Sequence, residues 1–148
     1  MDTDIALDFM LAREPQFADT RKLMLLGYLK EAELWISGAQ VNALLYVLTR
    51  GGKPAHNKSA QESLKKLLRC VHVYQAGEQE IAAVLDSTWP DLEDAWLHQA
   101  ALNLKADYLI TRNQKDFALS TIKVFDAVGL FAYLKEHQKI EFEEINLV

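Results

Sequence analysis

Acidic residues gather at three places along this sequence. The groups are Asp2, Asp4 and Asp8; Asp91, Glu93 and Asp94; and Asp116. Taken singly, each aspartate is best explained as a helix N-cap or first-turn residue, which stabilises a helix by roughly 0.5 to 2 kcal/mol. Capping does not explain the repetition, because neighbouring carboxylates raise one another's pKa and lower stability unless a cation neutralises them. The pattern therefore indicates a cation site.

Carboxylate oxygens are hard ligands, so the cation predicted is Mg²⁺ or Mn²⁺, held by a few acids and water. Zinc would prefer histidine or cysteine. The four histidines show no ligand spacing: His56, His72, His98 and His137. Cys70 is the single cysteine and lies in an apolar stretch, which favours a core residue over a nucleophile.

The apolar periodicity predicts the elements that must bring these acids together. Helices are expected near residues 5–11, 17–29, 41–48, 64–68, 81–85, 91–104 and 130–134, and strands at 34–36, 71–74, 108–110 and 123–125. Strands that alternate with helices imply an α/β fold, with a central parallel sheet between two helical layers. Ligands bind beyond the carboxyl ends of such strands, where the acids should meet. A polar loop is expected at residues 51–59.

Length and composition limit the possible classes of protein. The 148 residues are half hydrophobic and one quarter charged, which predicts a single globular domain over residues 1–148. The net charge of -5 argues against a protein that coats nucleic acid, so any such contact should be local. No apolar run approaches about 20 residues and the N-terminus is acidic, from which a cytoplasmic protein without a membrane segment is expected.

Three motifs carry a resemblance to a known family. They are Asp2-Thr3-Asp4-Ile5-Ala6-Leu7-Asp8; Asp91-Leu92-Glu93-Asp94-Ala95; and Ala106-Asp107-Tyr108-Leu109-Ile110-Thr111-Arg112-Asn113 followed by Asp116-Phe117. Together they resemble the PIN-domain family, and within it the VapC-type toxin ribonucleases. The resemblance covers nearly the whole chain, and the order and spacing of the three motifs are more specific than any one of them.

The resemblance implies a Mg²⁺- or Mn²⁺-dependent endoribonuclease that acts on RNA, often as a homodimer, with a small antitoxin protein that blocks the acidic pocket of toxin members. Carried over by position, Asp2, Asp94 and Asp116 are the catalytic metal ligands and Asp91 is a further metal ligand. Asp2 would end the first strand, although only Met1 precedes it, so either the true start lies upstream or that strand is a stub. The supporting residues are Asp4, Thr111, Asn113 and Asn42, and Arg112, with Arg13 and Lys115 nearby, would meet substrate phosphate.

The chain departs from the family on the helix after the second strand, where an acid is usual. The candidates there are Gln40, Asn42 and Ala43, of which Asn42 can offer a neutral oxygen. This favours an alternative: a catalytically weak or inactive PIN-like dimer that binds RNA or a partner. Its dimer contact would be the apolar tail of Ile140, Phe142, Ile145, Leu147 and Val148.

A second alternative is a haloacid-dehalogenase-like phosphohydrolase, because Asp2-Thr3-Asp4 has that family's Asp-x-Asp form. The two aspartates would then act as nucleophile and general acid. The sequence lacks the long apolar strand that should precede Asp2 and a convincing later lysine motif.

Overall fold

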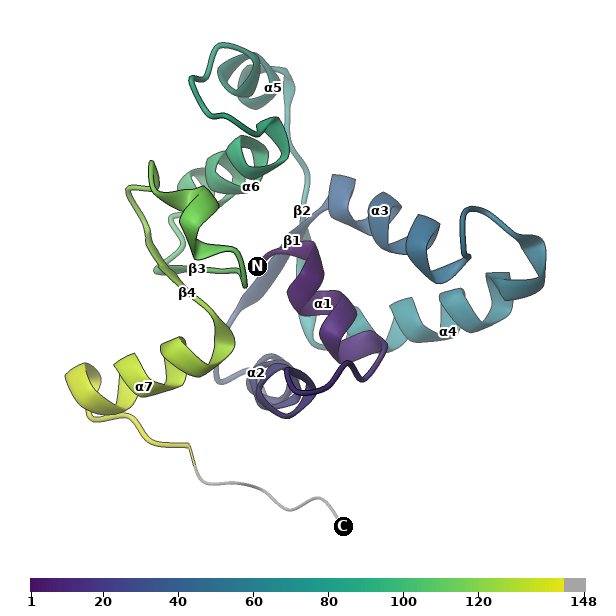
Figure 1. The fold of residues 1–148 in the computed structure, drawn as a ribbon, viewed down its shortest axis with the longest axis horizontal. Coiled ribbons are helices and arrows are strands. Elements are labelled where there is room, and N and C mark those ends of the chain that lie inside the picture. Colours follow the sequence, from purple (N-terminus) through teal and green to yellow (C-terminus); the bar gives the residue numbers. More distant parts are fainter. Residues whose placement is uncertain (143–148) are drawn as a thin grey trace.

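The computed structural model describes residues 1–142, which alternate between helices and strands (Figure 1). The elements are α1 (Thr3–Met10), α2 (Phe17–Tyr28), β1 (Leu34–Ser37), α3 (Gly38–Leu48), η1 (Pro54–His56), α4 (Asn57–Leu67), β2 (Val71–Tyr74), α5 (Glu78–Leu85), α6 (Leu92–Asn103), β3 (Tyr108–Ile110), η2 (Gln114–Phe117), β4 (Lys123–Phe125) and α7 (Ala127–Gln138). The seven helices and four strands expected from the sequence are confirmed.

The strands pair in parallel, as an α/β fold requires. β1 pairs with β2, with Leu34 opposite Val71, and β3 pairs with β4, with Tyr108 opposite Lys123. The two pairs are separate two-stranded sheets within the described residues, whereas one continuous central sheet was expected.

Met1 and Asp2 lie between these two sheets and connect them. The amino group of Met1 donates to the carbonyl of Trp35 in β1 (2.7 Å), and the amide of Asp2 donates to the carbonyl of Ile110 in β3 (2.8 Å). In Figure 1 the N-terminus accordingly lies between β1 and β3. The expectation that Asp2 ends a strand is wrong, because Asp2 is the N-cap of α1 and residues 1–2 are too few to form a ladder.

The core joins helices from both sides of the sheets. Helices α1, α3 and α4 pack on one another, with α3 beside β1, while α5 packs on α6 beside β3. The larger hydrophobic cluster is centred on residues such as Ile5, Leu23, Ile36, Leu44 and Leu67, and a smaller one consists of Leu97, Ala101, Leu109 and Phe117. The two hydrophobic clusters therefore support the first turns of α1 and α6.

The loop expected at residues 51–59 needs correction, while the dimer contact expected for the tail stays a prediction. The polar loop predicted at 51–59 is shorter, because η1 begins at Pro54 and α4 at Asn57. In the tail, Phe142 packs on Phe131 of its own chain (ring centroids 5.9 Å apart), and Ile145, Leu147 and Val148 lie outside the described residues.

Cys70 is half-buried, and burial raises the pKa of its thiol, as suits a structural cysteine. No helix within residues 1–142 has the length and apolarity needed to cross a membrane.

Candidate active site

Asp2 is held from two directions. Its Oδ1 accepts a hydrogen bond from the amide of Thr3 (2.6 Å), which caps α1, and its Oδ2 accepts one from the hydroxyl of Thr111 (2.7 Å). Thr111 follows β3 and is fully buried, and its hydroxyl oxygen accepts from the amide of Asn113 (3.0 Å). The turn after β3 therefore fixes the orientation of the Asp2 carboxylate.

The start of α6 brings two more carboxylates to the same place. Asp91 is the N-cap, and its side chain accepts from the amide of Glu93 (2.7 Å). Asp94 lies in the first turn and is half-buried. Capping thus accounts for the position of Asp91, while Asp94 has no hydrogen bond of this kind among the described residues.

The pKa of Asp94 reflects its burial and the acids around it. Its pKa is raised from the usual 3.8 to about 6, first by burial. The remaining contributions are the negative charges of Asp91, Asp2, Asp116 and Glu93. Acids from three distant segments are therefore close enough to oppose the ionisation of one carboxyl group.

Asp116 lies in η2 and is exposed, and the buried side chain of Phe117 anchors this turn. Among residues 1–142, no lysine, arginine or histidine forms an ion pair with any acid of this group, which we name the acid cluster: Asp2, Asp91, Asp94 and Asp116. No cationic side chain within residues 1–142 neutralises its negative charge.

A cavity of about 370 Å³ opens beside the acid cluster between α3, α5 and α6. Asp2, Glu93 and Asp94 contribute polar wall, and much of the remaining lining is apolar, including Leu92 and Trp96. A ligand that reaches the carboxylates can therefore also contact an apolar surface.

Helix α3 contributes an amide to this cavity, but from a position other than Asn42. Asn42 is exposed and is not part of the cavity lining, whereas Gln40 is. The amide nitrogen of Gln40 donates to the carbonyl of Met1 (2.9 Å) and to the hydroxyl of Thr3 (3.2 Å). Its oxygen accepts from the amide of Ser37 (2.7 Å), which completes a capping box. Gln40 therefore connects α3 to the residues around Asp2. The Ser-x-x-Gln spacing predicts the capping box with Ser37 but not the contacts with Met1 and Thr3.

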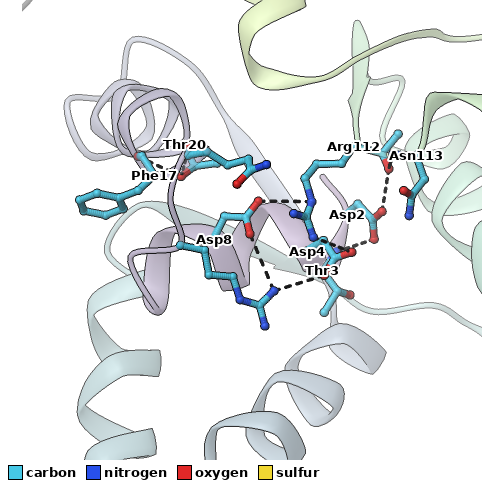
Figure 2. Close-up of polar contacts among 11 residues, drawn as sticks. Asp2, Thr3, Asp4, Asp8, Phe17, Thr20, Arg112 and Asn113 are labelled. Carbon is cyan, nitrogen blue, oxygen red and sulfur yellow. Dashed lines mark hydrogen bonds and ion pairs between the residues drawn. The ribbon is translucent and has the colours of Figure 1, made fainter.

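A second charged group, which includes Asp4, Asp8 and Arg112, lies near Asp2 (Figure 2). Arg112 contacts Asp4 (3.2 Å) and Asp8 (3.4 Å), and Arg13 contacts the same two carboxylates at 3.6 and 3.8 Å. We name these four residues the arginine cluster. Asp8 is fully buried, which raises the pKa of its carboxyl group, and the charges of Arg112 and Arg13 oppose that rise. The buried role of Asp8 was missed, since its spacing in α1 gave no sign of two arginine partners.

The donors of the acid cluster suit a hard divalent cation in their chemistry. They are all carboxylate oxygens, and the raised pKa of Asp94 reflects a concentration of negative charge that such an ion would relieve. In residues 1–142, no three acidic, histidine or cysteine side chains are already arranged to hold an ion. His98 belongs to a different environment: it is buried, its pKa is lowered by burial, and its Nε2 accepts from the amide of Thr121 (3.3 Å).

Parallel strands, an acid cluster at their ends and a helix that presents acids in its first turn define a class of α/β proteins with a negatively charged site. The PIN domain family model matches residues 1–115, so this chain belongs to the PIN domain family. Asp2, Asp91 and Asp94 fall inside the matched region, and Asp116 is the residue after it. A search of curated proteins gives no significant match. PIN domains are generally nucleases and typically use divalent metals, so the family replaces the dehalogenase alternative.

Proposed function

We propose that this PIN domain is an endoribonuclease that depends on Mg²⁺ or Mn²⁺. The observation that carries the proposal is the convergence of Asp2, Asp91 and Asp116 on Asp94, whose pKa is raised to about 6. Structural carboxylates are normally paired with cationic side chains, whereas strongly perturbed ones in a cavity are candidates for function.

In this proposal Asp2, Asp94 and Asp116 bind the metal and Asp91 supports them. The metal would supply activation of water and stabilisation of charge on the phosphate. Thr111 holds the Asp2 carboxylate in place through its 2.7 Å hydrogen bond, and Asn113 holds Thr111 through its amide. Because Asp94 is half-buried and surrounded by acids, a cation would favour its ionisation. Arg112 would contact the phosphate backbone of the RNA.

The resemblance to VapC-type toxins extends the proposal to a toxin that acts as a homodimer and is blocked by an antitoxin protein. The support here is the three sequence motifs alone. Growth arrest on expression of the wild type, absent on expression of Asp94→Asn, would favour the toxin role. Sedimentation of the purified chain would report the dimer.

A second candidate is a PIN module that binds RNA without cutting it. Two observations favour it: α3 presents Gln40 to the cavity where the family usually has an acid, and no ready metal geometry exists among residues 1–142. One fewer negative charge would weaken metal binding.

The test is cleavage of a panel of structured and single-stranded RNAs in Mn²⁺, Mg²⁺ or EDTA. Wild type should cut only with metal, and Asp94→Asn should lose at least about 100-fold in rate, since losing a ligand should exceed the loss typical of a second-shell partner. Asp107→Asn is the matched control, because Asp107 is exposed and outside the acid cluster. RNA binding without cutting at any metal concentration would move the conclusion to the binding module.

A further inference from the structure

We propose that Arg13 and Arg112 form a second phosphate site for RNA beside the acid cluster, which Asp4 occupies as a displaceable carboxylate in the free protein. This inference rests on the proposed function in taking RNA as the ligand, and it concerns a contact apart from the scissile phosphate. It is carried by the different burial of the two carboxylates that the arginines share.

Asp8 is the permanent partner of the two arginines. Its side chain has no exposed surface, so it cannot leave without unfolding α1 from the core. Asp4 contacts the same guanidinium groups from the solvent side, with 37% of its side chain exposed. A solvent-exposed ion pair contributes little to stability, so an incoming anion can replace Asp4 but not Asp8.

The guanidinium groups retain donors for a phosphate. Both oxygens of Asp8 lack a hydrogen-bond partner among the described residues, so its contacts with Arg112 and Arg13 at 3.4 and 3.8 Å are ion pairs without hydrogen-bond geometry. A guanidinium has five N–H donors, and its planar fork matches two phosphate oxygens. Asp8 neutralises the arginines, and Arg112 meets Asp8 through Nε but Asp4 through a different nitrogen, Nη2, which displacement of Asp4 would free.

The charge balance also favours exchange of one anion for another. Two carboxylates now face two guanidinium groups. A phosphodiester carries one negative charge, so replacing Asp4 by a backbone phosphate keeps the cluster neutral and releases the Asp4 carboxylate into water. Free inorganic phosphate would add more charge than the site can match, which favours a polymer backbone.

The position of the arginine cluster fits a phosphate near the one to be cut. Arg112 directly follows Thr111, whose hydroxyl holds Asp2, and Asp4 is on the same turn of α1 as Asp2 (Figure 2). Arg112 and Asp8 also line a cavity of about 390 Å³, together with Asp19 and Asp126, whereas Asp4 is not part of its lining. Those acids disfavour phosphate there, so the backbone should approach on the Asp4 side.

The experiment measures binding of a fluorescent single-stranded RNA by anisotropy in EDTA, where metal-dependent cutting cannot occur. Asp4→Asn should bind about threefold more tightly than wild type, because it removes the competing charge at an exposed position. Asp107→Asn, with the same change of charge at an exposed site before β3, should bind no more tightly than wild type.

A second variant isolates the arginines. Arg13→Ala/Arg112→Lys keeps one cation facing Asp8 and removes both forks, and it should bind RNA about tenfold more weakly. In this background Asp4→Asn should no longer tighten binding. Replacing single phosphates by neutral methylphosphonates should weaken binding at one position for wild type and at none for the double variant.

Equal tightening by Asp4→Asn and Asp107→Asn would overturn the proposal, because the effect would then come from overall charge. Tightening by Asp4→Asn that persists in the Arg13→Ala/Arg112→Lys background would overturn it as well. Loss of cutting in the RNA panel alone removes the nuclease and leaves this site standing, since binding in EDTA does not depend on catalysis.

Discussion

The first turns of α1 contribute acids to two neighbouring regions that treat negative charge in opposite ways. In the arginine cluster, Asp4 and Asp8 face two guanidinium groups, which oppose the rise that burial causes in the pKa of Asp8. In the acid cluster, every charge that acts on Asp94 is negative and reinforces the effect of burial. Arginines neutralise one region, whereas no cationic side chain among the described residues neutralises the other.

This difference separates carboxylates that arginines neutralise from carboxylates whose neighbours are other acids. Both regions bury carboxylate, so burial alone does not identify the site. What distinguishes them is the sign of the neighbouring charges, and the two should therefore respond differently when a charge is removed.

The largest expected effect comes from breaking the arginine cluster. Arg112→Ala should lower the free energy of unfolding at pH 7 by about 3 kcal/mol, because it leaves the fully buried Asp8 with only the more distant Arg13. Chemical denaturation followed by circular dichroism measures this change. Arg21→Ala, at an exposed position of α2, should change stability by less than about 0.5 kcal/mol.

A double variant tests whether Asp8 is the reason. Arg112→Ala/Asp8→Asn should recover most of the lost stability, since the uncompensated charge is gone. No recovery would mean that Arg112 acts through packing or through Asp4, and the contrast between the two regions would lose its physical basis.

Thr111 connects the two regions, and its removal should have an intermediate effect. Thr111→Val keeps the shape of a fully buried side chain and removes the hydroxyl that donates to Asp2. Hydrogen bonds to charged groups contribute about 1.5 to 3 kcal/mol, and Asp2 is partly exposed, so a loss of about 1.5 kcal/mol is expected. Thermal unfolding measures it, with the exposed Thr121→Val as control; an equal loss in both variants would assign the effect to threonine in general.

Removing a negative charge from the acid cluster should raise the free energy of unfolding, whereas the variants above lower it. Asp94→Asn should raise the free energy of unfolding in EDTA at pH 7.5 by about 1 kcal/mol, after allowing for its partial exposure and for the lost attraction to the N-terminus of α6. Denaturation in urea measures the gain. A destabilised Asp94→Asn would show that the carboxylate has a structural partner, and the acid cluster would then resemble its neighbour.

Periodicity and caps in the sequence were sufficient for the elements of the fold. β2, β3 and β4 have the predicted bounds, since short apolar runs between polar turns leave little choice of register. The connection of the two strand pairs through Met1 and Asp2 was not predictable, because it depends on backbone hydrogen bonds to Trp35 and Ile110 rather than on side-chain pattern.

The site was predictable where chemistry repeats and not where it depends on tertiary contact. The repeated acids and the turn after β3 drew attention to Asp2, Asp94 and Thr111, which the structure brings together. Asn42 was expected to support the site and instead faces solvent, because α3 turns Gln40 toward Met1 and Thr3. No spacing rule relates Asp8 to Arg112, which is 104 residues later in the chain.

The pH dependence of stability tests the contrast between the acid cluster and the arginine cluster with the smallest expected effect. The pKa of Asp94 is raised in the folded state to about 6, so between about pH 4 and 6 the folded chain binds more protons than the unfolded chain. Stability from this group is therefore lost as pH rises through that window, and the loss is complete above it. The advantage of Asp94→Asn over wild type in EDTA should then be absent near pH 4, grow up to about pH 6 and stay constant at higher pH. Melting temperatures of both proteins at half-unit steps of pH measure this difference. An advantage that is the same at pH 4 and pH 7.5 would mean that Asp94 titrates normally.

At pH 7.5, Mn²⁺ should raise the melting temperature of wild type more than that of Asp94→Asn, because a cation that neutralises the acid cluster binds the folded wild type best.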